Sequence, residues 1–341
     1  MEYLRQRFHE FLSDNWPVRV SEFTWETSEV FKSMAGHDYE ASFVEWHQAE
    51  RQRSKERARE FLDETGCKER FLALLERHRN GNVVPFVGAG LSIPSGFQGW
   101  GDFLTSLLAD APHAMEEVTS LIADGKYEEA AQIAHDQLGA DAFSEEIGNR
   151  LGPHHRKVAG PVSLMPEVFN AEVVTTNFDY VLTKAYEQLG RRFDREICGA
   201  ALRGAPARLG TERHCLLRLH GEAIEADGRV LTKQEYDATY TGQRTMAELF
   251  RELVGIRSFL FLGCSLREDR TIAALRDVKA AAPAGRPPHY AILPAPNANE
   301  RNQRRHQLAE AGIHPIYYPP NDHDQCIEDL LICLAEGELD D

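Results

Sequence analysis

The residues with the clearest chemical meaning form a glycine-rich turn directly after a short apolar run. Residues 83–87 read as a buried strand, and the turn that follows is Gly88-Ala89-Gly90, with Ser92 two residues further on. Because glycine has no Cβ, backbone N–H groups in such a turn can approach a phosphate closely, and a helix beginning there favours negative charge. The turn therefore predicts a site for a phosphorylated ligand, although two glycines can equally serve the geometry of a strand-to-helix turn.

Three more polar motifs follow apolar runs of strand length. They are Thr175-Thr176-Asn177-Phe178-Asp179, Leu219-His220-Gly221 and Leu262-Gly263-Cys264-Ser265. In an open parallel sheet the carboxyl ends of the strands line one crevice, so residues that follow different strands meet in one site. We therefore expect the glycine turn, Asn177, His220 and Ser265 to lie together.

The four motifs, in this order, resemble those of the sirtuin-like NAD-consuming domain. The resemblance covers roughly residues 82–335 and includes later strand-like runs at 289–293 and 313–318. In detail the chain looks more like the bacterial sirtuin-like domains of antiviral defence, which hydrolyse NAD to ADP-ribose and nicotinamide, than like the protein deacylases. The resemblance implies an α/β, Rossmann-like, doubly wound parallel sheet and NAD as the substrate.

Two departures from the deacylase sirtuins support this narrower resemblance. Deacylases hold a structural zinc with two Cys-x-x-Cys pairs, whereas no two of the six cysteines here have that spacing. Deacylases also follow the glycine turn with an Asp-Phe-Arg segment, where this chain has Ser95-Gly96-Phe97-Gln98-Gly99-Trp100. We therefore expect no zinc and no other metal site, and an acyl-lysine channel is not implied.

Asn177 and His220 are the expected catalytic residues. Cleavage of the bond between nicotinamide and ribose needs little nucleophilic power, because the leaving group departs as a neutral base. The Asn177 amide can hold ribose hydroxyls or an attacking water. His220, with an ordinary pKa near 6.5, can serve as a base in its neutral form. Both residue types also occur at strand ends for structural reasons, Asn to satisfy a turn and His as a hydrogen-bonded residue.

A further set of residues is expected to bind NAD: Gly88, Ala89, Gly90, Ser92, Thr176, Asp179, Gly263 and Ser265. The first four are expected at the pyrophosphate and the last two at the adenosine side. Asp179 can instead orient the Asn177 loop by accepting backbone N–H bonds. Asp269 could meet a ribose, though an exposed helix start explains this residue equally well.

Composition indicates an ordinary globular chain of 341 residues, 42% hydrophobic and 27% charged. No apolar run approaches the ~18 to 20 residues of a membrane helix, and the first residues lack an apolar signal core, so we expect a cytoplasmic protein. Six unpatterned cysteines agree with a reducing compartment. The net charge of −16 argues against nucleic-acid binding over the whole surface, while local basic patches leave such binding open.

The pattern of the chain changes at about residue 80. Residues 1–80 form an expected N-terminal helical segment, and residues 81–341 form the expected sirtuin-like NAD-binding domain, in which strands alternate with helices. A helical insertion at about 103–165 is expected to cover the ligand. Pro85 is awkward for a central strand because it cannot donate to the ladder. The aromatic residues of 1–80 either pack on the sheet domain or form a subunit interface.

The leading functional hypothesis is an NAD hydrolase that acts as a conditional antiphage effector in abortive infection. Its activity must be conditional because a free NAD hydrolase in the cytoplasm would kill its host. One alternative is ADP-ribosyl transfer to a protein or nucleic acid. Another is a nucleotide-binding scaffold or nuclease component assembled with a HerA-type ATPase, because defence systems pair such chains with that ATPase. We also expect a homo-oligomer whose contacts include part of residues 1–80.

Overall fold

A computed structural model gives the fold of the chain. It describes residues 4–153, 156–199, 214–226, 228–240, 245–255, 257–267, 270–281 and 286–339. The predicted position Asp269 lies outside the described residues.

The centre of the molecule is one parallel sheet. Within the described residues it has seven strands in the order β5-β6-β4-β3-β7-β8-β9, and every neighbouring pair is parallel. The strands are β3 (Val83–Val87), β4 (Val173–Thr175), β5 (Arg195–Cys198), β6 (Cys215–Arg218), β7 (Ser258–Leu262), β8 (His289–Pro294) and β9 (Ile313–Tyr318). The expected doubly wound α/β fold is therefore confirmed.

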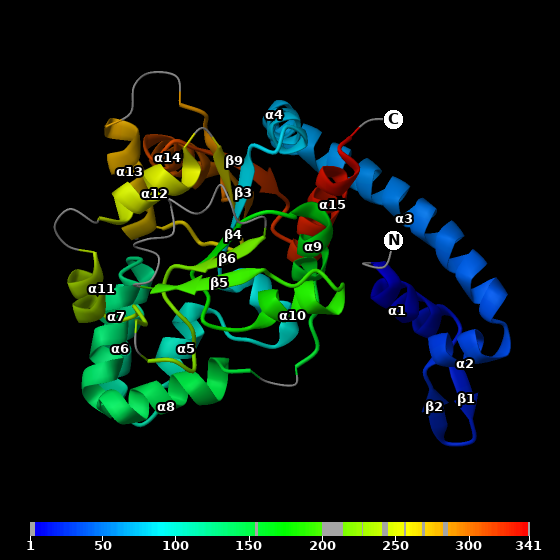
Figure 1. Cartoon of the computed structure of the whole chain (residues 1–341), viewed down its shortest axis with the longest axis horizontal. Helices are drawn as coiled ribbons and strands as arrows, with labels where there is room; N and C mark the ends of the chain where they lie inside the picture. The colour runs from blue at the N-terminus through cyan, green and yellow to red at the C-terminus, as the bar shows by residue number, and fades with distance from the viewer. Residues whose placement is uncertain are drawn as a thin grey trace.

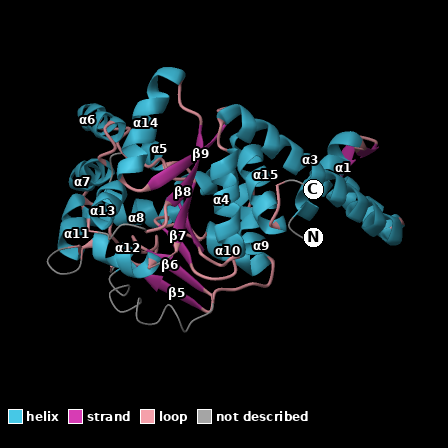
Figure 2. Ribbon diagram, turned by 90° about the horizontal axis from the view of Figure 1, so that it is seen from above, coloured by secondary structure: helices cyan, strands magenta, loops and turns pink. Residues whose placement is uncertain are grey.

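Helices cover both faces of this sheet, as Figure 2 shows. One layer consists of α4 (Lys68–Arg79), α9 (Met165–Val168), α10 (Val181–Gln188) and α15 (His323–Glu336). The other consists of α5 (Trp100–Ser106), α6 (Pro112–Ala123), α7 (Tyr127–Leu138), α8 (Ala140–Leu151), α11 (Lys233–Thr239), α12 (Met246–Val254), α13 (Arg270–Ala280) and α14 (Ala298–Glu310). Because both faces are covered, the central strands are apolar throughout, as the uniformly buried β7 illustrates.

The strand order reverses direction at β3. The chain passes from β3 to β4 on one side of the sheet and later returns to add β7 on the other side of β3. At such a reversal the loops that leave two adjacent strands diverge, which opens a crevice beyond their carboxyl ends. The glycine turn after β3 and the Gly263–Ser265 loop after β7 both lie at this point.

Pro85 is tolerated inside β3 because of where its missing donor would point. Backbone groups of alternate residues turn toward opposite neighbouring strands. The Thr176 N–H donates to the Val87 carbonyl at 3.4 Å, so Val87 and Pro85 both face β4. The β3–β4 ladder starts one residue after Pro85, with Phe86 opposite Val174. Pro85 thus occupies a position where the ladder needs no donor.

The N-terminal segment is an arm that extends away from the sheet (Figure 1). It contains α1 (Arg5–Asn15), β1 (Val18–Val20), β2 (Phe23–Trp25), α2 (Thr27–Met34) and the 30-residue α3 (Gly36–Thr65). The antiparallel β1–β2 hairpin is an addition to the helical segment that the sequence predicts. Phe8, Leu12, Tyr39 and Phe43 give the far end of the arm a small core of its own.

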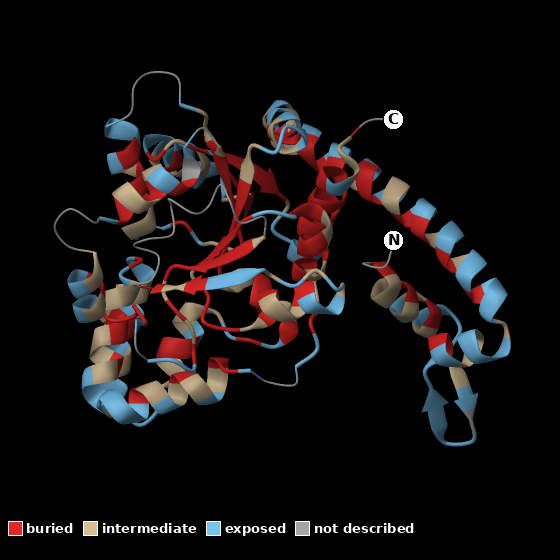
Figure 3. Cartoon of the chain, viewed as in Figure 1, coloured by how far each residue is buried: buried red, intermediate tan, exposed pale blue. Residues whose placement is uncertain are grey.

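The near end of the arm belongs to the main core. Ala58, Phe61 and Leu62 from α3 are buried together with the residues of the sheet domain. The adjoining faces of α3 and α15 are joined by ion pairs, including Arg57 to Asp329 at 2.7 Å. The arm is therefore attached through α3 and also through α1, where Arg7 contacts Gln325 and Glu328 of α15, while β2 is exposed (Figure 3).

Candidate active site

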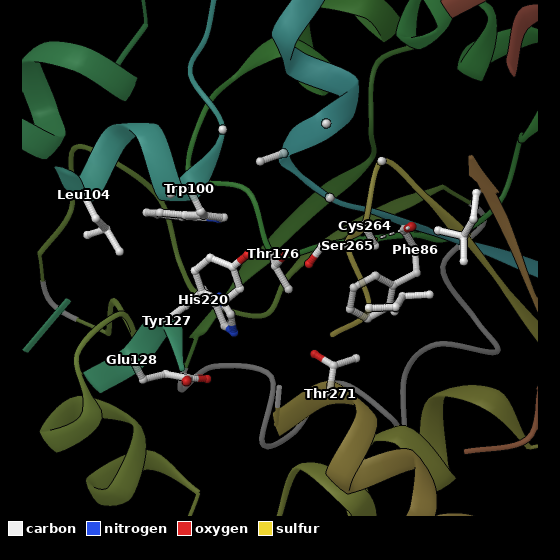
Figure 4. A pocket seen from close by; sticks show the side chains of 18 of the residues that line it. Phe86, Trp100, Leu104, Tyr127, Glu128, Thr176, His220, Cys264, Ser265 and Thr271 are labelled. Carbon is white, nitrogen blue, oxygen red and sulfur yellow. Dashed lines mark hydrogen bonds between the residues drawn. The ribbon is translucent and has the colours of Figure 1, made fainter. Parts of the chain in front are cut away.

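A cavity of about 430 Å³ lies at the reversal point of the sheet. Loops that follow β3, β4, β6 and β7 form its floor, and helices α5, α7, α11 and α13 supply walls. Its volume falls within the range typical of sites for small molecules and cofactors. Figure 4 shows the labelled side chains around it, with Trp100 and Leu104 at upper left, Glu128 at lower left and Thr271 at lower right.

Most of the predicted site residues border this cavity. Those on its wall are Gly88, Ala89, Gly90, Thr176, His220, Gly263 and Ser265. Ser92, Asn177 and Asp179 are not on the wall, and all three are buried. The four motifs thus meet at one place, with part of the set behind the surface that a ligand would touch.

The glycine turn and the loop after β7 interlock. Gly88 donates its N–H to the Leu262 carbonyl at 2.8 Å, and Gly90 donates to the Gly263 carbonyl at 2.9 Å. A Cβ on Gly263 would lie 2.5 Å from the backbone nitrogen of Leu91, and Gly263 has a φ of +66°. These contacts explain why glycine is needed on both sides. They also show that the Gly88 and Gly90 amides are already paired within the protein.

Asn177 is held in one orientation by its neighbours. Its Nδ2 donates to the Ser92 hydroxyl oxygen at 3.2 Å, and its backbone N–H donates to Oγ1 of Thr175 at 3.0 Å. The Ser92 hydroxyl in turn hydrogen-bonds the Asp179 carboxylate, so it must accept from Asn177. Oδ1 of Asn177 is then the free end of the amide, and this buried oxygen has no partner among the described residues.

Asp179 lies behind the cavity rather than in it. Its carboxylate accepts the Val181 N–H at 2.9 Å at the start of α10, as well as the Ser92 hydroxyl. Burial raises the pKa of this carboxyl. These contacts favour the interpretation that Asp179 orients the Asn177 loop.

His220 follows β6 and presents its ring to the cavity. The ring packs between Phe178 and Tyr236, with ring centroids 6.3 and 5.9 Å away. Burial lowers the pKa of His220 to about 4, so the ring is neutral near pH 7. Nε2 is shielded from solvent and finds no hydrogen-bond partner in the described parts of the chain. Buried polar atoms are usually paired, and Nε2 belongs to a residue of the cavity wall, so it is a position where a ligand atom fits, whereas the unpartnered Oδ1 of Asn177 lies behind this wall.

Arg218 is a site residue that the sequence analysis missed. This β6 residue is fully buried and its guanidinium donates to the Asp179 carbonyl at 2.8 Å and to the Asn177 carbonyl at 3.3 Å. It also pairs with Glu196 at 3.0 Å. The sequence did contain a signal for this residue, because Arg218 is a lone arginine inside an apolar strand. A charge in such a place is buried only when it is paired, so it indicates a polar network around it.

The helical walls supply further residues that the motifs did not indicate. They are Trp100, Tyr127, Glu128, Tyr236 and Thr271. Of the described residues that line the cavity, Glu128 is the only acidic one, and none is a lysine or arginine.

A second, more open cavity of about 540 Å³ adjoins the first at Cys264, Ser265 and Pro294 and extends along α14. Together they form a crevice that can take an extended ligand.

The described residues contain no group of three or more His, Cys, Asp or Glu side chains placed to hold a metal ion. All six cysteines are free thiols. The absence of zinc stays a prediction. None of the helices in the described ranges combines the length and the apolar character that crossing a bilayer requires.

Comparison with known proteins gives two kinds of match. Residues 171–316 match the SIR2-like domain family. The chain is 26% identical over 240 residues to an NAD(+) hydrolase ThsA of Cytobacillus dafuensis, which covers 70% of this chain and 45% of that protein. It is 24% identical to the NAD(+) hydrolase ThsA of Enterococcus faecium, over 68% of this chain and 46% of the relative.

A defence-associated sirtuin 2 of Bacillus subtilis is 26% identical over 57% of this chain and 19% of its own length. The matches therefore span less than half the length of each of these relatives. They confirm the resemblance seen in the four motifs. The residues that match the SIR2-like domain family include β4, β6 and β7 with the loops that carry Asn177 and His220, so the similarity extends over the candidate site.

Proposed function

We propose that this chain hydrolyses NAD to nicotinamide and ADP-ribose in the crevice at the carboxyl ends of β3, β4, β6 and β7. The observation that carries the proposal is the pair of unpartnered buried atoms, Oδ1 of Asn177 and Nε2 of His220, contributed by loops that follow two adjacent strands. The similarity to relatives named NAD(+) hydrolase supports NAD as the substrate in this proposal.

The reaction asks little of the protein beyond positioning and one proton transfer. The bond that breaks joins the ribose C1′ to the nicotinamide nitrogen, and its electron pair leaves with neutral nicotinamide. Water forms the new bond to C1′ and gives up a proton, which Nε2 of His220 accepts. A weak base suffices because the positive charge that develops on the ribose makes C1′ reactive toward water.

Asn177 acts through the one atom that its surroundings leave available. Because Nδ2 is held by Ser92, Oδ1 accepts a hydrogen bond either from a ribose hydroxyl or from the attacking water. Either bond fixes the position of the attacking water relative to C1′. Holding the reactants in position in this way accounts for much of the rate enhancement in such a reaction. In this proposal Ser92, Asp179 and Arg218 are positioning residues. Gly88, Ala89, Gly90, Thr176, Gly263 and Ser265 contact NAD.

Product analysis tests the reaction and its alternative. The full chain, incubated with NAD and analysed by chromatography and mass spectrometry, should yield nicotinamide and free ADP-ribose in equal amounts. Nicotinamide accompanied by ADP-ribose attached to protein or nucleic acid would replace hydrolysis by ADP-ribosyl transfer. Binding of NAD without any nicotinamide release, with the activating partner present, would leave a nucleotide-binding scaffold instead.

We also propose that the chain acts in the cytoplasm as a conditional antiphage effector. The relative named defence-associated sirtuin supports the defence role, and the free thiols agree with a reducing compartment. A HerA-type ATPase partner rests on the motif resemblance alone. Co-purification of the two chains from one cell tests it.

A homo-oligomer that uses the arm belongs to the same proposal. Its support is a group of exposed apolar side chains near the far end of the arm, including Phe23 at 73%, Trp25 at 58% and Met34 at 82% exposure. Such residues anchor protein interfaces. Light scattering on the parent and on the Phe23→Ser/Trp25→Ser variant tests it, and an unchanged mass would remove the hairpin from the interface. Truncation at Lys68 is less suitable, because it also removes buried residues such as Phe61 from the main core.

A further inference from the structure

A further cavity lies at the opposite end of the sheet from the candidate active site. It measures about 260 Å³ and borders the amino ends of β7, β8 and β9 together with the last turns of α12 and α13. Its charged and polar lining consists of Arg257, Lys279, Arg286, His289 and His314, and none of its described lining residues is acidic. This is unusual in a chain with a net charge of −16, and it contrasts with the main cavity, which has no lysine or arginine on its described wall.

Two of the three cations have no acidic partner in the described part of the chain. Arg257 is neutralised by Glu172, with an N–O distance of 2.8 Å. Lys279 donates to the Ala309 carbonyl, Arg286 is exposed, and neither forms an ion pair with a described residue. Two unneutralised positive charges on one small cavity favour an anionic ligand.

The electrostatic surroundings of the two histidines agree with this. Burial, with smaller contributions from nearby Arg286 and Arg77, lowers the pKa of His289 to about 4. Burial also lowers the pKa of His314, helped by Arg70 and Lys279. The groups that act on either ring are thus all cationic or histidine, which indicates a positive potential in this cavity.

His289 adds a directed donor. Its side chain is only 9% exposed, and its Nδ1 accepts the Phe259 N–H at 3.1 Å. A neutral imidazole with an accepting Nδ1 carries its proton on Nε2. His289 lines the cavity, so this N–H can donate to a ligand oxygen or ring nitrogen there.

The rest of the wall is apolar and suits a ring. Phe250, Leu275 and Val278 lie on the helix side, and Pro287 and Pro288 precede β8. The volume lies just below the ~300 to 1,000 Å³ of sites for drug-sized ligands, which limits the ligand to a small molecule. We propose that this cavity binds a mononucleotide, with its phosphate at Lys279 and Arg286, its base against the apolar wall, and a hydrogen bond from His289 Nε2.

Calorimetry on the full chain tests the proposal with adenosine monophosphate as the probe. The titration is done with saturating ADP-ribose, which would occupy the crevice at the other end of the sheet. Adenosine monophosphate should still bind, and the Lys279→Gln/Arg286→Gln variant should weaken its binding at least tenfold while ADP-ribose binding is unchanged. The Arg19→Gln/Lys32→Gln variant is the matched control, since it removes two positive charges from the arm.

Several results would overturn the proposal. They are the absence of adenosine monophosphate binding when ADP-ribose is present, equal affinity in the parent and the cavity variant, and an equal loss in the control variant. Two fragments of the nucleotide test the phosphate site and the apolar wall separately. Adenosine that binds as tightly as the monophosphate would contradict the role of the cations, and ribose 5-phosphate that does so would contradict the role of the apolar wall. If the protein binds no ADP-ribose at all, the proposed function fails, but the comparison of variants still decides this cavity.

Discussion

The interlocked glycine turns give the sharpest test of how the fold builds the site. Gly263 has a φ of +66° and its missing Cβ would lie 2.5 Å from the Leu91 nitrogen, a backbone atom that cannot rotate away. Gly190, at the end of α10, has a φ of +68° and no atom within 4 Å of the same position. Substituting alanine at each position therefore imposes the same backbone strain, but only Gly263→Ala also forces the glycine turn to move.

The expected magnitudes follow from these two costs. A left-handed conformation costs a non-glycine residue roughly 1 to 2 kcal/mol, and overpacking of a tight contact adds roughly 1 to 3 kcal/mol. Gly190→Ala should thus lower the free energy of unfolding by roughly 1 to 2 kcal/mol and Gly263→Ala by roughly 2 to 5 kcal/mol. Because Gly263 contacts Gly88 and Gly90, Gly263→Ala should also weaken ADP-ribose binding by about tenfold or more, equivalent to about 1.4 kcal/mol.

Urea unfolding followed by circular dichroism gives the stabilities, and calorimetry gives the affinities. The reasoning is refuted if the two variants lose the same stability and both keep the parent's affinity for ADP-ribose. A Gly190→Ala variant that loses affinity would also contradict it, since that position lies outside the cavity wall.

Three more predictions concern Ser92 behind the cavity wall, His220 on it, and the metal. Ser92→Ala removes the hydrogen-bond partner of Asn177 Nδ2 and of the Asp179 carboxylate, so it should lower the free energy of unfolding by roughly 1 to 3 kcal/mol. The same variant should lower kcat for NAD cleavage with little change in KM. An unchanged kcat would exclude the positioning role of Ser92. His220 has a pKa of about 4 in the folded state and about 6.5 in the unfolded state, so protons bind the unfolded state more tightly. Its contribution to the free energy of unfolding is therefore fully present above pH 6.5 and is lost as the pH falls from 6.5 through 4. Between pH 7 and pH 5 the parent should therefore lose roughly 2 kcal/mol more unfolding free energy than His220→Gln, and equal losses in urea unfolding would contradict this. A chelator should leave the melting temperature unchanged, whereas stoichiometric zinc by elemental analysis would overturn the prediction of a zinc-free domain.

The strands could be predicted where apolar runs are continuous. Residues of β3, β7 and β8 are buried on both faces of the sheet, so their sequences carry the signal directly. β5 was missed because it is an edge strand whose first two residues, Arg195 and Glu196, are exposed. The β1–β2 hairpin was missed for a similar reason, since its strands have three residues each and β2 is exposed throughout.

The part of the site that follows from the geometry of a parallel sheet could be predicted from the sequence. Motifs at the carboxyl ends of neighbouring strands must converge, and this places His220 beside the glycine turn without any knowledge of the helices. The walls formed by Trp100, Tyr127 and Glu128 depend on how α5 and α7 cross the sheet, which no local pattern specifies. The Ser92 hydroxyl was expected to face a ligand, but it is buried and turned toward Asn177, because two polar side chains behind the wall need a partner.

The most direct test of the central claim is the rate of NAD cleavage by the full chain and two single variants, each with its ADP-ribose affinity measured alongside. Asn177→Ala and His220→Ala should lose most of the nicotinamide release, at least about a hundredfold, while they keep their fold and most of their affinity for ADP-ribose. His306→Ala, which changes an exposed histidine on α14, is the matched control and should cleave NAD at the parent's rate. If both site variants release nicotinamide as fast as the parent, the unpartnered atoms of Asn177 and His220 do not carry the reaction and the assignment of this crevice is wrong.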